Sequence, residues 1–316
     1  MAADIRAIAT FLIVGVAVLC MGCGEDAILP EPSLQDEPAY VTDSQIAFVS
    51  DRDGYTRIYV MNTDGTNQRP LSDPVYGSDT WPAWSPDGAR IAFTSDPDGM
   101  GDIFVMDADG GDRRNLSNTE PAEESHPTWS PDGAQIAFEG RYPAGIRTMV
   151  VDGDGAAVES AREISSAETD RRPTWSPGGT RFAFVIMDRI GAEVFTMDAD
   201  GRDRSRLRLA STSDEPAWSP DGRSIALTVI NPKQHGAREG LRSIMVRGLV
   251  SGVVRIVTDN PRGNDESPTW SPDGRSIAYA ARDGARSDIH VVNLDDGTVT
   301  QLTNTRHFDG MPSWSP

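Results

Sequence analysis

The sequence is poor in cysteine and in positive charge, and each shortage excludes a class of protein. Its only two cysteines, Cys20 and Cys23, lie at the N-terminal end of the 316 residues. The rest of the chain can therefore form neither a disulfide nor a cysteine-ligated metal centre. Twenty-nine Lys and Arg oppose 48 Asp and Glu, which gives a net charge of −19. Such acidity argues against a nucleic-acid partner. The negative charge could instead serve a cationic partner, a metal ion or solubility alone.

Long apolar runs are also missing, with one exception. AIATFLIVGVAVL occupies residues 7–19 and LCMGC follows at 19–23; the apolar run is too short to span a bilayer comfortably. The pattern resembles a bacterial lipoprotein signal peptide over residues 1–22, with lipid on Cys23. An ordinary secretory signal is the alternative, and both predict export. Residues 23–43 are acidic and Pro-rich, and predict a solvated tether of about 25 Å if flexible.

Glycine and proline are plentiful, with 30 and 22 copies, and they punctuate a repeat. The phrase PAWSPDGARIAF at 82–93 returns in near-copies, each with one tryptophan. These tryptophans are Trp84, Trp129, Trp175, Trp218, Trp270 and Trp314. Their spacing lies between 43 and 52 residues. A period in the forties, with several short strands in each unit, is typical of a β-propeller blade.

Each copy predicts four antiparallel strands. PxW is a short strand A, and SPDG is a turn in which Pro fixes φ and Gly takes positive φ. ARIAFTS-like and DIFVMD-like segments follow as strands B and C, and a DADG-like turn leads into strand D. D-x-D-G also resembles a calcium loop, but the further ligands of that loop are absent. A hairpin turn is therefore the preferred interpretation.

The two ends of the chain hold complementary fragments of one blade. The first strand B starts at Ile46 without a PxWSP before it, and the last PxWSP, at Trp314, has no strand B after it. We therefore expect the C-terminal strand A to join strands B, C and D from the N-terminus and close the ring. The prediction is an all-β, six-bladed propeller over residues 44–316.

PxWSPDGxxIAF, followed by IYVMD and DG-x-LT, resembles the repeat of TolB-type six-bladed propellers, a WD40-like repeat. The resemblance covers roughly residues 44–316 and implies the fold more specifically than the function. The α/β domain that precedes the propeller in TolB is not expected here. Prolyl-oligopeptidase-type enzymes join related propellers to a serine hydrolase domain, but no residues remain for one and no GxSxG occurs.

Acidic residues recur in the connectors between blades, which the alternation of strands places around one mouth of the central channel. Three residues before the strand-A prolines stand Asp79, Glu124, Asp170, Ser213, Asp265 and Asp309, and blade five has its acid one place later, at Asp214. Sixfold repetition favours a structural role, in which each acid caps a connector. The alternative is a ring that focuses negative potential on a cation or a basic partner segment. The two roles can coexist.

The position before each strand-A proline varies instead: Trp81, His126, Arg172, Glu215, Ser267 and Met311. Equivalent positions with six chemistries are where specificity could reside, and Trp81 either contacts a ligand or packs under its own connector. His126 and His307 are the only connector histidines, and with Glu124 or Asp309 they are weak candidates for a metal site. The long loop 231–242 carries Lys233, His235, Arg238 and Arg242; it either overhangs the mouth or is a solvated insertion.

These features predict a non-catalytic scaffold of the bacterial cell envelope, facing the periplasm or the cell exterior. It is expected to be a monomer that binds an envelope protein. In one form of this prediction, a basic segment of the partner makes the contact. Only its lipid would touch a membrane, and no cofactor is expected beyond a divalent cation at the mouth. The alternatives are a metal-assisted lyase or hydrolase, and a carbohydrate or cell-wall binder, with the site at the channel mouth.

Overall fold

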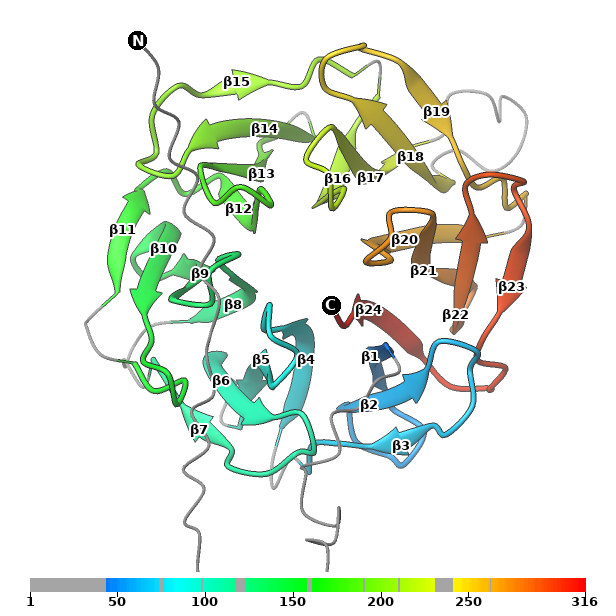
Figure 1. Cartoon of the computed structure of the whole chain (residues 1–316), viewed down its shortest axis with the longest axis horizontal. Helices are drawn as coiled ribbons and strands as arrows, with labels where there is room; N and C mark the ends of the chain where they lie inside the picture. The colour runs from blue at the N-terminus through cyan, green and yellow to red at the C-terminus, as the bar shows by residue number, and fades with distance from the viewer. Residues whose placement is uncertain are drawn as a thin grey trace, which may run out of the picture. The chain divides into compact units, whose positions relative to one another are not determined.

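Six four-stranded antiparallel sheets are arranged around a common axis, as Figure 1 shows. The computed structural model describes residues 44–316 except 74–76, 98, 118–122, 158–160, 190, 210, 231–240 and 262. The predicted signal peptide, Cys23 and the tether lie outside the described residues, as does most of the basic loop 231–242. No helix with the length and apolarity to cross a membrane occurs among the described residues. The predicted six-bladed, all-β fold is confirmed.

The blades follow one another along the chain, and each runs from its innermost to its outermost strand. Blade 1 consists of β24 (Asp309–Trp314), β1 (Gln45–Ser50), β2 (Arg57–Asn62) and β3 (Arg69–Pro70). Blade 2 consists of β4 (Ser78–Trp84), β5 (Arg90–Asp96), β6 (Asp102–Asp107) and β7 (Arg114–Asn115). Blade 3 consists of β8 (Glu124–Trp129), β9 (Gln135–Arg141), β10 (Ala144–Val150) and β11 (Arg162–Ser165).

The second half of the ring repeats this plan. Blade 4 consists of β12 (Asp170–Trp175), β13 (Arg181–Met187), β14 (Ala192–Asp198) and β15 (Ser205–Arg206). Blade 5 consists of β16 (Ser213–Trp218), β17 (Ser224–Ile230), β18 (Arg242–Gly248) and β19 (Val254–Ile256). Blade 6 consists of β20 (Asn264–Trp270), β21 (Ser276–Asp283), β22 (Arg286–Asn293) and β23 (Val299–Gln301).

The C-terminal strand β24 pairs with the N-terminal strand β1, as predicted. The junction reproduces the bonds that a continuous chain makes elsewhere. In blade 2 the Ser85 N–H donates to the Arg90 carbonyl, and the Arg90 N–H donates to Ser85 Oγ at 2.9 Å. In blade 1 the Ser315 N–H donates to the Gln45 carbonyl, and the Gln45 N–H donates to Ser315 Oγ at 2.8 Å. The two chain ends therefore complete one blade with no open edge between them.

The core lies between neighbouring blades. Strand B supplies it in every blade, because residues such as Ile91, Ala92 and Phe93 are fully buried on both faces of the sheet. The repeat tryptophans pack across the same interfaces: Nε1 of Trp129 donates to the Ala83 carbonyl of the preceding blade, at 3.1 Å. Trp270 makes the equivalent bond to Ala217. Burial on both faces explains why the IAF segment hardly varies among the copies.

The SPDG segments form the predicted turns. The glycines take positive φ, for example 69° at Gly88. In blade 2 the Asp87 carboxylate accepts from Ser85 Oγ at 2.6 Å and from the Ala89 N–H at 3.0 Å. These hydrogen bonds, with the nearby charge of Arg90, offset its partial desolvation and lower the pKa of Asp87 below its usual value. The turn is thus held by its own side chains.

Candidate functional site

The innermost strand of every blade is interrupted at the residue before its proline. This residue has left-handed φ in all six copies: Trp81 (53°), His126 (55°), Arg172 (50°), Glu215 (50°), Ser267 (56°) and Met311 (52°). The pairing with strand B shifts register at the same point, as between Thr80 and Ala83. Positive φ is uncommon for residues other than glycine, and β-bulges re-aim side chains. A strained conformation that recurs six times indicates a constraint on where these side chains point.

The six side chains line one cavity on the axis, of about 240 Å³. We call it the central cavity. Its wall is built from the variable residue, the following proline and, in five blades, the residue after that proline. The small side chains of Thr128, Thr174 and Thr269 contribute hydroxyls to this wall. The structure therefore places the variable position at the centre of the ring. The acids that recur in the connectors, such as Asp79 and Asp170, are absent from the lining of the cavity.

Trp81, His126 and Arg172 interact with one another in the cavity wall. The rings of Trp81 and His126 have centroids 4.0 Å apart and are tilted by 33°. The guanidinium of Arg172 lies over the Trp81 ring at 5.6 Å. Residues from three successive blades thus form one contiguous group. Trp81 packs against side chains of other blades, so neither of its predicted roles, exposed contact or packing under its own connector, describes it fully.

His126 is held in its neutral form. Burial, followed by the nearby charges of Arg172 and Arg171, lowers the pKa of His126 well below its usual value. Its Nδ1 lies 2.9 Å from Ser125 Oγ and 3.5 Å from the Glu139 carboxylate. Its Nε2 is buried and has no hydrogen-bond partner among the described residues.

Glu215 links side chains of blades 4, 5 and 6 in another part of the cavity wall. Its carboxylate accepts from the Ser267 N–H at 2.8 Å, from Ser267 Oγ at 3.1 Å and from Thr228 Oγ1 at 2.8 Å. Arg172 lies 2.6 Å from the Asp214 carboxylate and 3.7 Å from that of Glu215. These two acids outweigh the desolvation of the guanidinium and raise the pKa of Arg172. The predicted residues Arg172, Asp214 and Glu215 are therefore brought together as one ion-paired group.

Strand-B side chains support the bulges from the preceding blade. The His126 N–H donates to Thr94 Oγ1 at 3.2 Å, and the Arg172 N–H donates to the Glu139 carboxylate at 3.2 Å. Glu139 is also ion-paired with Arg171 at 2.5 Å. Sequence reasoning missed Thr94 and Glu139. The signal for them was their shared position directly after the IAF segment, where other copies carry Val, Thr or Ala.

The repeated connector acids lie inside the protein. Asp79, Glu124, Asp170, Asp265 and Asp309 are each at most 1 % exposed. Asp79 and Asp170 both accept two hydrogen bonds from one arginine, Arg113 and Arg204 respectively, at 2.7–3.0 Å. Each arginine lies over the strand-B phenylalanine of its own blade. Among the described residues the five acids are thus buried rather than arranged as an exposed ring, and the partners of Asp79 and Asp170 are arginine side chains; capping of the connectors stays a prediction.

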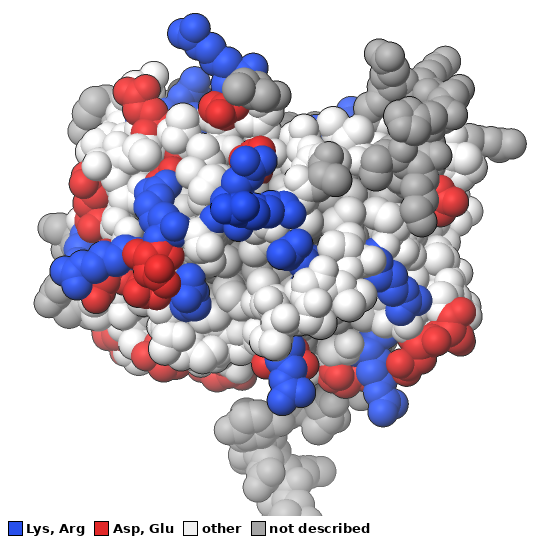
Figure 2. Space-filling view, turned by 90° about the horizontal axis from the view of Figure 1, so that it is seen from above, with Lys and Arg blue, Asp and Glu red and all other residues white. Residues whose placement is uncertain are grey.

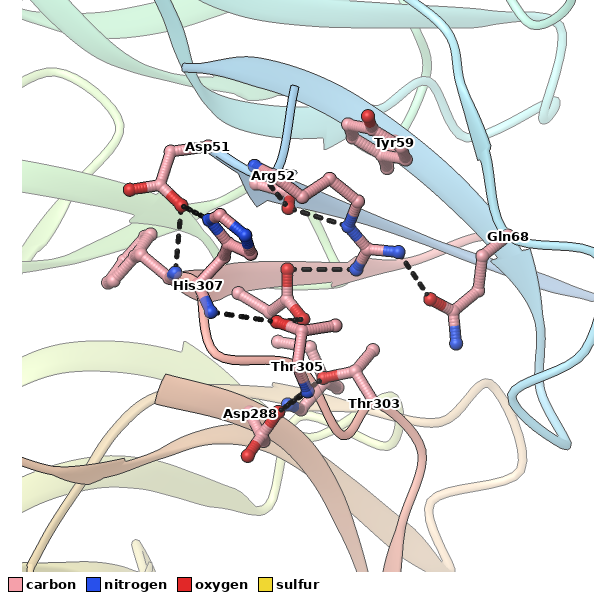
Figure 3. Close-up of polar contacts among 12 residues, drawn as sticks. Asp51, Arg52, Tyr59, Gln68, Asp288, Thr303, Thr305 and His307 are labelled. Atoms are coloured by element: carbon pink, nitrogen blue, oxygen red, sulfur yellow. Dashed lines mark hydrogen bonds and ion pairs between the residues drawn. The ribbon is translucent and has the colours of Figure 1, made fainter. Parts of the chain in front are cut away.

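Blade 1 builds the same pairing from a different residue, as Figure 3 shows. Gln68 occupies the position of Arg113 and Arg204, three residues before the strand-D leucine. Arg52, from the loop after β1, replaces the missing guanidinium: it donates to Asp309 at 2.9 Å and to Gln68 Oε1 at 2.7 Å. It also lies over the rings of Phe48 and Tyr59. Arg52 thus comes from a different loop than Arg113 and Arg204 do, and it binds the equivalent connector carboxylate.

The remaining copies depart further from this plan. Glu124 lies 3.6 Å from Arg147 of β10, and blade 5 has the uncharged Ser213, whose Oγ accepts from the Val194 N–H. Asp265 accepts from Asn260 Nδ2 at 3.2 Å. Its burial, against the opposing effect of hydrogen bonds from Thr258 and Asn260, raises the pKa of Asp265 to about 6. Asp265 therefore has no guanidinium partner among the described residues, unlike Asp79, Asp170 and Asp309.

The two connector histidines belong to different surroundings. His126 lines the central cavity, whereas His307 Nδ1 lies 3.5 Å from Asp51 in the connector to blade 1 (Figure 3). Within the described residues, no group of three or more His, Cys, Asp or Glu side chains is arranged to hold a metal ion. Lys233, His235 and Arg238 of the basic loop lie outside the described residues. Arg242 is ion-paired with Glu266 at 3.0 Å.

Comparison with known proteins agrees with this architecture. Residues 27–222 and 210–316 match the family of TolB β-propeller domains, PD40. The chain belongs to this family. Relatives within it include the Tol-Pal system protein TolB of Hydrogenovibrio crunogenus, 35 % identical over 102 residues, which are 32 % of this chain and 21 % of that protein. Dipeptidyl-peptidase 5 of Porphyromonas gingivalis is 34 % identical over 109 residues, 32 % of this chain and 16 % of the peptidase.

The matched segments thus span about a fifth or less of these two relatives. Among solved structures, TolB from Acinetobacter baumannii superposes with a TM-score of 0.70 at 22 % identity and covers 86 % of this chain and 67 % of its own. Oligogalacturonate lyase from Vibrio parahaemolyticus superposes with a TM-score of 0.55 at 15 % identity, over 82 % of this chain and 74 % of the lyase. At these identities the likeness establishes the PD40 fold and nothing further about chemistry.

Proposed function

We propose that this PD40 propeller is a non-catalytic protein of the bacterial envelope that binds an extended segment of a partner protein in its central cavity. One observation carries the proposal: six side chains of different chemistry, at equivalent left-handed positions, converge on a single cavity. The scaffold repeats while the cavity wall does not, and this is the distribution expected of a recognition site.

The size of the cavity favours an inserted side chain over a larger ligand. Its volume of about 240 Å³ lies below the roughly 300–1,000 Å³ of sites that enclose drug-sized molecules. Part of the Trp81 ring is already covered by His126 and Arg172. These contacts count against a stacked sugar ring and favour one or two side chains of a peptide, bordered by Trp81 and Met311.

The charge of the segment follows from the pairing of the acids. The connector carboxylates are buried, and those of Asp79, Asp170 and Asp309 are ion-paired. Asp214 and Glu215 already neutralise Arg172. We therefore expect an apolar or neutral side chain in the cavity. A basic segment would have to compete with Arg172 for Glu215.

The envelope location rests on the predicted signal over residues 1–22 and lipid on Cys23. The relatives support it, since several are named as components of the Tol-Pal system. Export, lipid anchoring and the monomeric state belong to this proposal. Mass spectrometry of the mature N-terminus tests the lipid directly: Cys23 should carry it, and an unmodified or differently cut N-terminus would contradict the anchor.

Partner capture tests the cavity. The full chain and its Trp81→Ala and Arg172→Ala variants would be crosslinked in envelope extract and purified, after thermal melts confirm that the variants fold. Asp273→Asn is the matched control, because Asp273 lies in the turn at the other end of an innermost strand. We expect one protein to be recovered with the wild type and the control and lost with both cavity variants. Equal recovery with all four chains would refute the proposal.

A further inference from the structure

Blade 5 differs from the other blades at its outer rim. Its turn between strands C and D reads GLVSGVV, where the other blades carry Asp- or Asn-containing turns. Val250 is 96 % exposed, Val253 64 % and Val254 45 %. Figure 2 views the rim from the side of blades 4 and 5, and a broad stretch without charged side chains lies right of its centre. Three exposed valines in this turn and at the start of β19 (Val254–Ile256) are unusual on a chain this acidic.

The edge of β19 also has backbone groups without a partner among the described residues. The Gly248 N–H donates to the Val253 carbonyl, and the Val257 N–H donates to the Ile244 carbonyl. Because backbone groups alternate in direction along an antiparallel strand, those of Val254 and Ile256 point away from β18. They can pair with another extended chain.

Blades 1 and 4 protect this edge at an outward position, whereas β23 of blade 6 (Val299–Gln301) carries neither proline nor a charged residue there. Pro70 of β3 occupies the place of Ile256, since the Leu71 N–H that follows it donates inward to Ile58, as the Val257 N–H does to Ile244. β15 carries Arg206 in the same place, whereas Arg114 of β7 corresponds to Arg255 of β19. Proline and charged residues are the usual means of keeping edge strands unpaired. Blade 5 lacks both at its outward positions.

The charge around this edge is the reverse of the chain as a whole. Residues 240–258 contain no Asp or Glu but include three arginines, in a protein of net charge −19. Arg242 is paired with Glu266. Arg247 and Arg255 form no ion pair with another described residue, and Arg255 donates to the Leu294 carbonyl of blade 6. Arg255 on β19 and Arg247 on the neighbouring β18 thus carry charges that no carboxylate among the described residues neutralises.

We propose that the β19 edge binds an extended peptide segment with apolar residues flanked by carboxylates, which adds a fifth strand to blade 5. A second copy of the chain is disfavoured, because a two-fold pairing of this edge with itself would bring the arginines of both copies together. Three exposed valines, of which only Val254 lies on β19, also fall far short of the about 800 Å² per partner of a stable dimer. β-strand addition needs only a short edge and pockets for alternate side chains. This surface is separate from the central cavity.

A labelled peptide tests the edge. The probe is acetyl-Asp-Glu-Val-Thr-Val-Thr-Val-Asp-Glu, titrated by fluorescence anisotropy against the full chain at low salt. The comparison peptides carry N-methyl groups on alternate amides, or Lys in place of the terminal acids. We expect saturable binding of the first peptide below about 1 mM. Binding should be lost on N-methylation and weakened by Lys, because edge hydrogen bonds and the two arginines both contribute.

Val254→Pro is the decisive variant. It removes an outward-pointing N–H and no ladder bond, so the fold should persist. Val299→Pro is the matched control: Val299 is 48 % exposed and occupies the same outward position on β23 of blade 6. We expect Val254→Pro to weaken binding at least about tenfold and Val299→Pro to leave it within about twofold. Equal affinity for both variants, undiminished binding of the N-methylated peptide, or a wild-type dimer that Val254→Pro dissociates would each overturn the proposal.

Discussion

Removing Arg52 should destabilise blade 1 far more than its position in a loop suggests. Arg52→Ala takes the guanidinium from Asp309, whose side chain is fully buried while that of Arg52 is 19 % exposed. It also removes the donors to Gln68 and Ser50. The Asp309 carboxylate would keep only the hydroxyl of Thr305, at 3.1 Å, among its side-chain donors shown in Figure 3.

The size of the effect follows from this burial. Leaving one member of a buried ion pair without its partner costs roughly 3–5 kcal/mol. The partial exposure of Arg52 and the remaining Thr305 bond place the loss near the lower end. The lost contacts over Phe48 and Tyr59 add about 0.5–1 kcal/mol. We expect a total of about 3–4 kcal/mol, and a Tm lowered by roughly 6–16 °C at about 2–4 °C per kcal/mol.

Gln68→Arg should rescue this loss. The substitution restores the arginine that blades 2 and 4 carry at the same position, as Arg113 and Arg204, and the Phe48–Tyr59 ring pair that would support it is already present. Thermal and urea unfolding of wild type, Arg52→Ala, Gln68→Arg and the double variant would measure the cycle. Arg69→Ala, an exposed arginine of β3, is the control and should stay within about 0.5 kcal/mol of wild type.

Two results would refute the reasoning. An Arg52→Ala variant within about 1 kcal/mol of wild type would mean that Asp309 does not depend on the guanidinium. A double variant no more stable than Arg52→Ala would mean that the two positions are not alternative sources of one interaction. Either result would remove the basis for assigning the connector acids a structural role.

Three further predictions follow from the buried groups and the ring closure. The raised pKa of Asp265, about 6 against 3.8, makes the folded chain bind the proton more tightly than the unfolded chain, so stability falls as the pH rises from about 4 to about 6. Asp265→Asn should therefore raise the free energy of unfolding by about 3 kcal/mol at pH 7 and by little at pH 3.5; urea unfolding at both pH values checks this, and equal stability at pH 7 would contradict it. Trp81→Ala admits water to His126, so NMR titration should show its pKa rising toward the ordinary value, whereas an unchanged pKa would mean that Trp81 does not shield it. Deleting residues 309–316 removes β24 and exposes the edge of β1, so the melting transition should broaden and fall by more than about 10 °C; an unaltered melting curve would show that closure does not stabilise the ring.

The fold could be predicted from the sequence because six copies of the repeat carry the same pattern of strands and turns. Six copies of one phrase fixed the strands, the turns and the blade that the chain ends share. The variable position before each proline could also be identified, because a comparison among copies separates scaffold from specifics. Its inward direction was not predictable, since it depends on a left-handed conformation that six different residues adopt.

The partners of the connector acids were beyond the sequence. Arg113 and Arg204 lie 34 residues from their carboxylates, and Arg52 lies 257 residues from Asp309. A long arginine reaches its carboxylate over aromatic rings on two strands, and spacing along the chain does not encode that path. The aromatic pairs Phe93–Phe104 and Phe184–Phe195, each followed by Arg three residues before a leucine, were the available signal.

Site-specific photocrosslinking from the central cavity tests the account most directly. A benzophenone amino acid at Met311, which lines the cavity, would be activated in cells that express the full chain, with the same label at Asp273 as the control. We predict that the label at position 311 forms an adduct with one envelope protein, and that Arg172→Ala in the same chain abolishes it. The absence of an adduct at 311, or the same adduct from both positions, would contradict a binding site in the cavity.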